Sequence, residues 1–407
     1  MCIRDRNVNG IISTETEQVV ENVQVSLQGG NAEVYTDSFG AYAFPAMGTG
    51  GDYIVDPADN SAPLDGISTL DLVMIQRHIL GVEELNSPYK IIAADVNANN
   101  VVDGVDLVEL RKLILGVYTE LPENESWRFV DKGYVFNDAL SPLDENFSED
   151  YQISNLGQNM TIDFVAIKVG DVDGTVDQLL SGETDESRSS KSSTIISELR
   201  DQEIVQNEIV SMPFTIANAT SITGFQFELD YDVSRIEIQS IQGVNIDLTE
   251  SNYNLKDNSL ALSWANNIAV TDAQFEITFR TLTNVKLDEV FDINQKSTIQ
   301  AEVYDDKMRT HKLLMTPTDA TPELVLQNNP NPFNTETELI FYLENNSVTD
   351  IVITDTQGRV VKSISQNLEA GLNTMTLEKA DLGNPGIYYL TVRTNSQNEM
   401  IKLVLLD

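Results

Sequence analysis

Residues 95–106 place oxygen-bearing side chains at a spacing that suits a hard divalent cation. Calcium loops of twelve residues use side-chain oxygens at positions 1, 3, 5, 9 and 12 and a backbone carbonyl at position 7. The predicted ligands, in the order of positions 1, 3, 5, 7, 9 and 12, are Asp95, Asn97, Asn99, Val101, Asp103 and Asp106. Position 6 requires a left-handed turn, and Asn100, which occupies it, tolerates that conformation better than most residues.

A helix is predicted immediately after this loop. Apolar residues recur at helical spacing over residues 106–116, and Gly116 gives the C-terminal signal. The alternative is a polar turn in which Asp106 serves only as the helix N-cap. An internal repeat favours the calcium interpretation, because residues 71–82 match residues 106–117 at seven of twelve positions with an offset of 35.

The first copy of the repeat has a poorer loop. Counting back from Asp71 places Asn60 at position 1, but Ala62 and Leu64 at positions 3 and 5 offer no side-chain oxygen. An altered calcium site is the hypothesis here, with Asp65 as an optional addition to these predicted ligands: Asp59, Asn60, Gly66, Ser68 and Asp71. The alternative is a helix N-cap at Ser68 or Thr69 without an ion. Asp171 and Asp173, in a glycine-bounded turn over residues 170–174, form either a plain turn or a further cation contact.

The duplicated loop-helix unit over residues 58–120 resembles the dockerin domain. This resemblance implies Ca²⁺ as the cofactor and a cohesin-like domain as the partner, in the same chain or in another. It also suggests a link to polysaccharide degradation.

Composition limits the class of function. The net charge of −39 argues against nucleic-acid binding, which needs Lys and Arg clusters, and suits an extracellular, calcium-rich environment. A single cysteine, Cys2, excludes an internal disulfide framework. No apolar run is long enough for a transmembrane helix. No signal peptide is visible, from which we expect that the natural N-terminus is missing or mis-assembled.

Alternating apolar and polar residues predict β-strands in most of the remaining sequence, so the fold class is mainly β: several β-sandwiches with one small α-helical calcium-binding module. The expected segments are a sandwich over residues 7–57, the helical module over 58–120, a β extension packed on it over 121–180, a flexible linker over 181–200, a second sandwich over 201–315 and a C-terminal domain over 322–407.

Three of these segments also resemble known families. Residues 36–44, a tight turn followed by Tyr42 and Phe44, resemble the carboxypeptidase-regulatory-like and adhesin B-type immunoglobulin-like domains. Residues 224–232 resemble cohesin-like, carbohydrate-binding-type sandwiches. The motif order over 329–406, from the Asn-Pro-Asn-Pro-Phe-Asn run to the final strand, resembles the C-terminal sorting domain of type IX secretion substrates of the Bacteroidota. That domain implies contact with the type IX machinery, export across the outer membrane and a secreted or cell-surface location.

The sequence therefore predicts a secreted, non-catalytic, calcium-binding surface or scaffold protein. Two alternatives remain open. The chain is the accessory C-terminal part of a secreted glycoside hydrolase, or it is a carbohydrate-binding protein whose aromatic platform includes Trp264, Tyr231 or Tyr253. Acidic pairs such as Asp230 and Asp232 arise by chance in a chain with 64 acidic residues and carry no catalytic argument.

Overall fold

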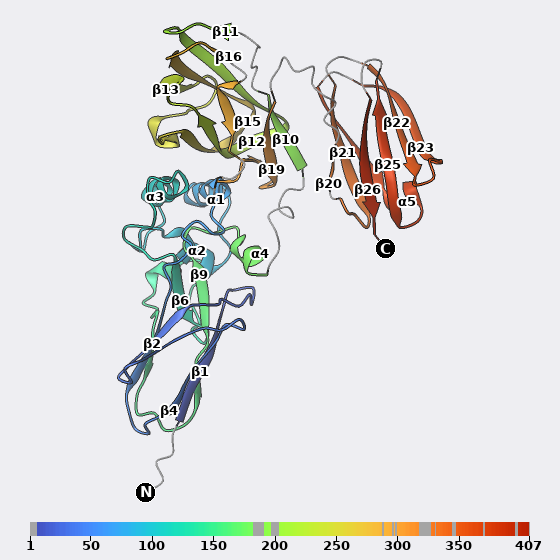
Figure 1. The fold of residues 1–407 in the computed structure, drawn as a ribbon. Helices are drawn as coiled ribbons and strands as arrows, with labels where there is room; N and C mark the ends of the chain where they lie inside the picture. Colours follow the sequence, from blue (N-terminus) through green and yellow to red (C-terminus); the bar gives the residue numbers. More distant parts are fainter. Residues whose placement is uncertain are drawn as a thin grey trace.

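A computed structural model of the chain describes residues 6–181, 191–196, 203–286, 289–294, 297, 299–316, 327–329, 331–343, 347–368, 371–394 and 398–406. These residues form three β-sandwiches and a helical module that lies between the first two (Figure 1). The predicted mainly-β fold class is confirmed. None of the described helices is both long and apolar enough to cross a membrane.

The N-terminal sandwich consists of two sheets around one buried apolar cluster. One sheet has the order β4-β1-β9-β6, with β8 paired to β1, and the other has the order β3-β2-β5-β7. The strands are β1 Arg6–Ser13, β2 Gln24–Gln28, β3 Ala32–Tyr35, β4 Ala41–Met47, β5 Tyr53–Ala58, β6 Trp127–Asp131, β7 Tyr151–Ile153, β8 Met160–Thr161 and β9 Phe164–Lys168.

Strands from two separate segments thus share both sheets. β1 runs parallel to β9, with Ile12 opposite Phe164, and β5 pairs antiparallel with β7. The helical module is inserted between β5 and β6. β9 is buried on both faces, because Phe164 and Ala166 enter the sandwich core while Ile167 enters the core of the helices. Residues 121–180 therefore complete the first sandwich as well as contacting the helical module.

The helical module contains α1 Thr69–Ile79, α2 Pro88–Ala94 and α3 Gly104–Ile114. Ser68 caps α1 and Asp103 caps α3, each with an acidic residue three positions later that completes a capping box. Leu72, Leu110 and Leu113 are fully buried between the helices. A short helix, α4 Val176–Leu180, follows β9.

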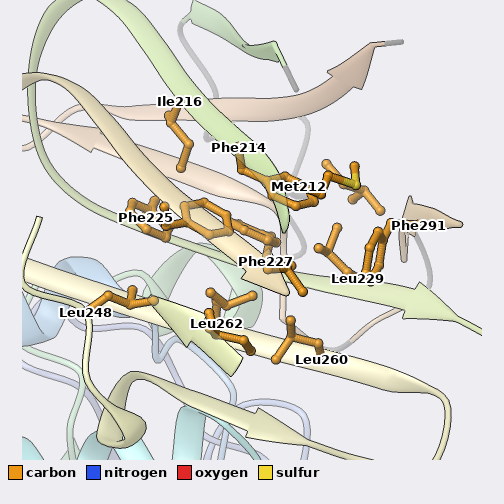
Figure 2. Packing of buried hydrophobic residues seen from close by; sticks show 14 of the residues in the cluster. Met212, Phe214, Ile216, Phe225, Phe227, Leu229, Leu248, Leu260, Leu262 and Phe291 are labelled. Atoms are coloured by element: carbon orange, nitrogen blue, oxygen red, sulfur yellow. The ribbon is translucent and has the colours of Figure 1, made fainter. Parts of the chain in front are cut away.

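The middle sandwich is built on two long strands, β12 Ile209–Tyr231 and β15 Ser259–Thr281. Register shifts in β12 lie between Ala217 and Gly224, and both halves of the strand contribute side chains to the same core. Figure 2 shows Phe214 from the first half near Phe225 and Phe227 from the second. The other strands are β10 Lys191–Ile196, β11 Glu203–Ile204, β13 Ile236–Gly243, β14 Tyr253–Leu255, β16 Val285–Lys286, β17 Phe291–Ile293, β18 Glu302–Asp305 and β19 Thr310–Thr316.

The segment predicted as a linker contains one of these strands. Residues 191–196 form β10, which pairs in parallel with β19, because Thr194, Ile195 and Ile196 are strong strand formers. The rest of the predicted linker, apart from residue 181, lies outside the described residues.

The C-terminal sandwich has its own apolar core between two sheets. Their orders are β20-β21-β24 and β23-β22-β25-β26. The elements are β20 Gln327–Asn329, β21 Glu336–Leu343, β22 Ser347–Asp355, β23 Val360–Leu368, β24 Gly371–Glu378, α5 Lys379–Leu382, β25 Gly386–Arg393 and β26 Asn398–Leu405.

Candidate metal centre

The loop between α2 and α3 wraps its backbone around two buried carboxylates. Asp95, the C-cap of α2, accepts hydrogen bonds from the backbone N–H of Asn99 (3.0 Å) and of Asn100 (3.1 Å). Asn100 has a φ of 65°, the left-handed conformation that position 6 of a calcium loop requires. The first half of the loop is therefore held by backbone hydrogen bonds to the Asp95 carboxylate.

Asp106 closes the loop from its other end. Its two carboxylate oxygens accept from the backbone N–H of Asn97 (3.2 Å) and of Asp103 (2.8 Å). Asp103 in turn accepts from Val105 at 2.7 Å as the N-cap of α3. The N-cap of α3 is therefore Asp103, and the expected N-cap at Asp106 is wrong, because Asp106 is the third residue of the helix and completes the capping box. These backbone donors do not occupy all of the lone pairs of either carboxylate.

The remaining predicted ligands of this loop lie on its outer turn. The Asn97 amide oxygen accepts from the N–H of Asn99 (3.1 Å), and the Asn99 amide oxygen accepts from the N–H of Val101 (2.8 Å). The Val101 side chain is exposed, so this residue is placed to contribute through its backbone alone. The predicted ligands therefore lie along one turn, and their convergence on an ion stays a prediction.

Burial makes the ionised forms of Asp95 and Asp106 unfavourable in free energy. Desolvation raises the pKa of Asp95 and the pKa of Asp106 above the ordinary value, and the nearby Asp103 charge adds to the shift. Arg128 on β6 partly offsets this at Asp95, since its guanidinium lies 3.6 Å from the carboxylate. A cation bound between the two carboxylates would remove the remaining cost, which is the chemistry that Ca²⁺ supplies.

Of the residues predicted for the first loop, Asn60 is bonded elsewhere, whereas Gly66 and Ser68 lie beside the carboxylates of Asp171 and Asp71. The Asn60 side-chain oxygen accepts from the N–H of Ser126 at 2.8 Å, which ties this residue to the start of β6. The Gly66 carbonyl accepts from the Thr175 hydroxyl at 2.7 Å. Ser68 caps α1, and its N–H donates to Asp71 at 2.8 Å.

Asp71 is instead joined by two carboxylates from a loop 100 residues further along the chain. One oxygen each of Asp71, Asp171 and Asp173 lie within 4.8 Å of one another. The backbone N–H groups of Val172 and Asp173 donate to Asp71 at 2.9 and 3.1 Å, so the β9–α4 loop folds over the first turn of α1. We call Asp71, Asp171 and Asp173 the acidic triad. It supplies carboxylates where residues 62 and 64 have none.

Repulsion and burial of the carboxylates in the acidic triad lower the stability of the fold at neutral pH. Burial and the Asp173 charge raise the pKa of Asp71 and of Asp171 well above the ordinary 3.8. Groups with a raised folded-state pKa stabilise the fold below their ordinary pKa, and this contribution is lost as the pH rises through the folded-state value. At neutral pH without metal, the triad therefore destabilises the fold.

We expect Asp173→Asn to raise the melting temperature in chelator by a few degrees, since ~1 kcal/mol corresponds to roughly 2–4 °C in a unit of this size. Asn retains the acceptor for the Thr175 N–H. The difference in melting temperature between Asp173→Asn and wild type in chelator should grow from pH 4 to pH 8. In calcium, the wild type should melt at the higher temperature. Thermal unfolding across this pH range, with and without calcium, measures both effects. A variant that is less stable at every pH in chelator would contradict the prediction.

The aromatic residues considered for glycan binding do not form an open platform. Trp264 is 2% exposed, stacks on Phe225 and donates its indole N–H to the Asp247 carbonyl at 3.1 Å. Tyr231 and Tyr253 are half-buried against the same core. Trp264 is therefore part of the packing of the middle sandwich.

Comparison with known proteins identifies two segments. Residues 65–115 match the dockerin type I domain, and residues 329–406 match the secretion system C-terminal sorting domain. No curated protein matches the sequence.

Solved structures similar to parts of the chain include a non-cellulosomal cohesin from Archaeoglobus fulgidus, which is 19% identical and covers 30% of this chain and 86% of its own (TM-score 0.22). A cohesin–dockerin complex from Clostridium thermocellum is 16% identical and covers 31% and 91% (TM-score 0.24). PorZ, a surface component of the type IX secretion system of Porphyromonas gingivalis, is 15% identical and covers 26% and 15% (TM-score 0.17). Identities this low concern the fold alone.

The two matched domains agree with the interpretation of the sequence. The sorting domain directs a protein to the type IX machinery, and the dockerin domain is an assembly module that pairs with cohesin-like partners. The chain therefore carries a dockerin type I domain at residues 65–115 and a C-terminal sorting domain at residues 329–406, and it is a secreted or cell-surface protein.

Proposed function

We propose that this chain is a non-catalytic, calcium-dependent assembly protein of the cell exterior. Its dockerin domain is the docking element, a cohesin-like sandwich is the partner, and the type IX machinery is the exporter. The accessory part of a glycoside hydrolase remains the alternative from another class, and a catalytic domain encoded upstream in the same reading frame would favour it.

The observation that carries the calcium proposal is the geometry around Asp95 and Asp106. Both carboxylates are fully buried, and backbone N–H groups of the same twelve-residue loop, those of Asn97, Asn99, Asn100 and Asp103, donate to them. Two buried like charges without a counter-ion would be unfavourable, and Arg128 reaches Asp95 alone. Hard oxygen ligands in this number favour Ca²⁺ over transition metals.

The acidic triad is the second proposed calcium site. It combines one carboxylate from the start of α1 with two from the β9–α4 loop. A cation there would join the helical module to the strand that it packs on, because Asp171 and Asp173 follow β9 directly. The two sites together would make the fold of residues 58–180 depend on calcium.

Calorimetric titration of the metal-stripped full chain with calcium tests this proposal. We expect two binding events in the wild type, one in Asp106→Ala and one in Asp173→Asn. Magnesium at the same concentration is the control for selectivity, since it requires a more rigid octahedral site. Absence of binding heat in the wild type, confirmed by equilibrium dialysis, would refute the calcium function.

A further inference from the structure

We infer that the docking partner of this dockerin domain is the middle sandwich of the same chain, so that the docking face is filled within one molecule. This inference rests on the proposed function, in which the helical module is a docking element, and it names the partner. Two contact points, one at the start of α1 and one at the end of α3, carry the argument.

The first contact point is Thr69 in the first turn of α1. Its backbone N–H donates to the Gln226 side chain on β12 at 2.7 Å, and its hydroxyl lies 2.7 Å from the Ser263 hydroxyl on β15. Gln226 on β12 and Ser263 on β15 are opposite each other in the sheet. The two hydrogen bonds of Thr69 therefore hold the start of α1 over this one residue pair. Thr69 and Ser263 are completely buried, and each finds a partner across the contact.

Gly224 allows α1 to lie this close to the sheet. A Cβ atom added at Gly224 would stand 3.1 Å from Val73 Cγ2 and 3.4 Å from Thr69 Cγ2, with no room for a longer side chain. A glycine inside a strand weakens the strand and often marks the close approach of another backbone or ligand. Here it accommodates the helix.

The second contact point is the C-terminal end of α3. The Leu115 carbonyl, one of the acceptors that a helix end leaves unpaired, accepts from the Asn254 side chain at 3.0 Å. The Leu115 side chain is buried with Ala261 and Ile299 of the middle sandwich. Lys256 Nζ lies beside Gly116, where the negative end of the helix dipole favours a cation.

The two contact points use opposite ends of two helices on one face of the module. Together they fix both the position and the direction of the module on the sheet, as Figure 1 shows for α1 and α3 beneath the middle sandwich. A tether between two sites makes docking intramolecular, with an effective concentration in the millimolar range for short linkers. A cohesin-like domain of another molecule, at a concentration below this effective concentration, would therefore be excluded from the face of α1 and α3 by the middle sandwich.

Disulfide trapping in the full chain tests this inference directly. Cys2 is the only cysteine, so Cys2→Ser gives a cysteine-free background. In that background, Thr69→Cys with Ser263→Cys should yield a disulfide within one monomer after mild oxidation, since the replaced oxygens are 2.7 Å apart and the S–S bond is ~2.05 Å long. The control pair is Thr69→Cys with Ser211→Cys, because Ser211 is exposed and lies thirteen residues before Gly224 on β12.

Non-reducing electrophoresis and mass spectrometry distinguish the outcomes at micromolar protein. A monomeric disulfide in the test pair alone supports docking within the chain. Disulfide-linked dimers or ladders would overturn it and leave the proposed function intact, since docking would then occur between molecules. Absence of any disulfide would overturn the contact itself.

A second variant keeps the test independent of cysteine chemistry. Gly224→Leu should expel α1 from the sheet and lower hydrogen-exchange protection of residues 69–73 by about tenfold or more. Protection of residues 275–279 in the core of the sandwich should not change. Ser211→Leu, an exposed position on the same strand, is the matched control. Unchanged protection of residues 69–73 in Gly224→Leu would contradict the inference.

Discussion

Replacing both Asp95 and Asp106 by alanine is expected to remove the part of the stability of the helical module that calcium supplies through residues 95–106. A ligand at 100 times its Kd stabilises the folded state by about 2.7 kcal/mol, which corresponds to roughly 5–10 °C in a unit of 150–250 residues. Through this loop, wild-type protein should therefore gain about 5–10 °C in calcium relative to chelator, whereas the double variant should lose that gain and keep only the increment that the acidic triad supplies.

The comparison between calcium and chelator separates metal binding from helix capping. Asp106 also accepts the Asp103 N–H in the capping box of α3, so its loss costs about 0.5–2 kcal/mol in either buffer. Asp37→Ala is the matched control, because Asp37 also accepts two backbone N–H groups, from Phe39 and Ala41, but in an exposed turn of the N-terminal sandwich. A double variant that retains the calcium increment of the wild type would refute the role of this loop.

Deleting residues 329–406 is expected to abolish the appearance of the protein outside the cell almost completely. These residues match the sorting domain and form a sandwich with its own core, to which no residue of the middle sandwich contributes among the described residues. The truncated chain should therefore keep its other domains folded and accumulate in the periplasm. Fractionation of a host with a type IX system, followed by immunoblotting, measures the distribution.

Two controls make the export result interpretable. Asp173→Asn, which leaves the sorting domain unchanged, should be exported like the wild type. Fusion of residues 329–406 to a periplasmic reporter protein should carry the reporter out of the cell. Surface display of the truncated chain at the wild-type level would contradict the assignment of the sorting signal.

The second calcium loop could be predicted from the sequence because everything it needs is local. Asp95 and Asp106 are eleven positions apart, and the left-handed Asn100 follows from residue type and position, whereas the N-cap lies at Asp103 and not at the expected Asp106. The calcium itself and the full ligand set stay predictions. The C-terminal sorting domain was recognisable for the same reason, since its motifs occur in a fixed order over a short segment.

The features that the sequence did not reveal are all non-local. Asp71 meets Asp171 across 100 residues, and β1 meets β9 across a longer interval, so no spacing rule connects them. For the turn over residues 170–174 the sequence leaves a plain turn and a cation contact open, and it does not indicate that Asp71 is the neighbour. A signal for docking was present in Gly224, because a glycine within a strand often marks a close approach, although residue type alone could not name α1 as the neighbour.

We propose that oxygen atoms of residues 95–106 hold Ca²⁺ and thereby order the helix pair that docks on the middle sandwich. Crystals of the full chain soaked in calcium, with diffraction data collected at long wavelength, test it most directly. We expect an anomalous peak between the carboxylates of Asp95 and Asp106, with oxygen neighbours at about 2.3–2.6 Å. A pocket that shows no anomalous signal and contains only water would contradict it.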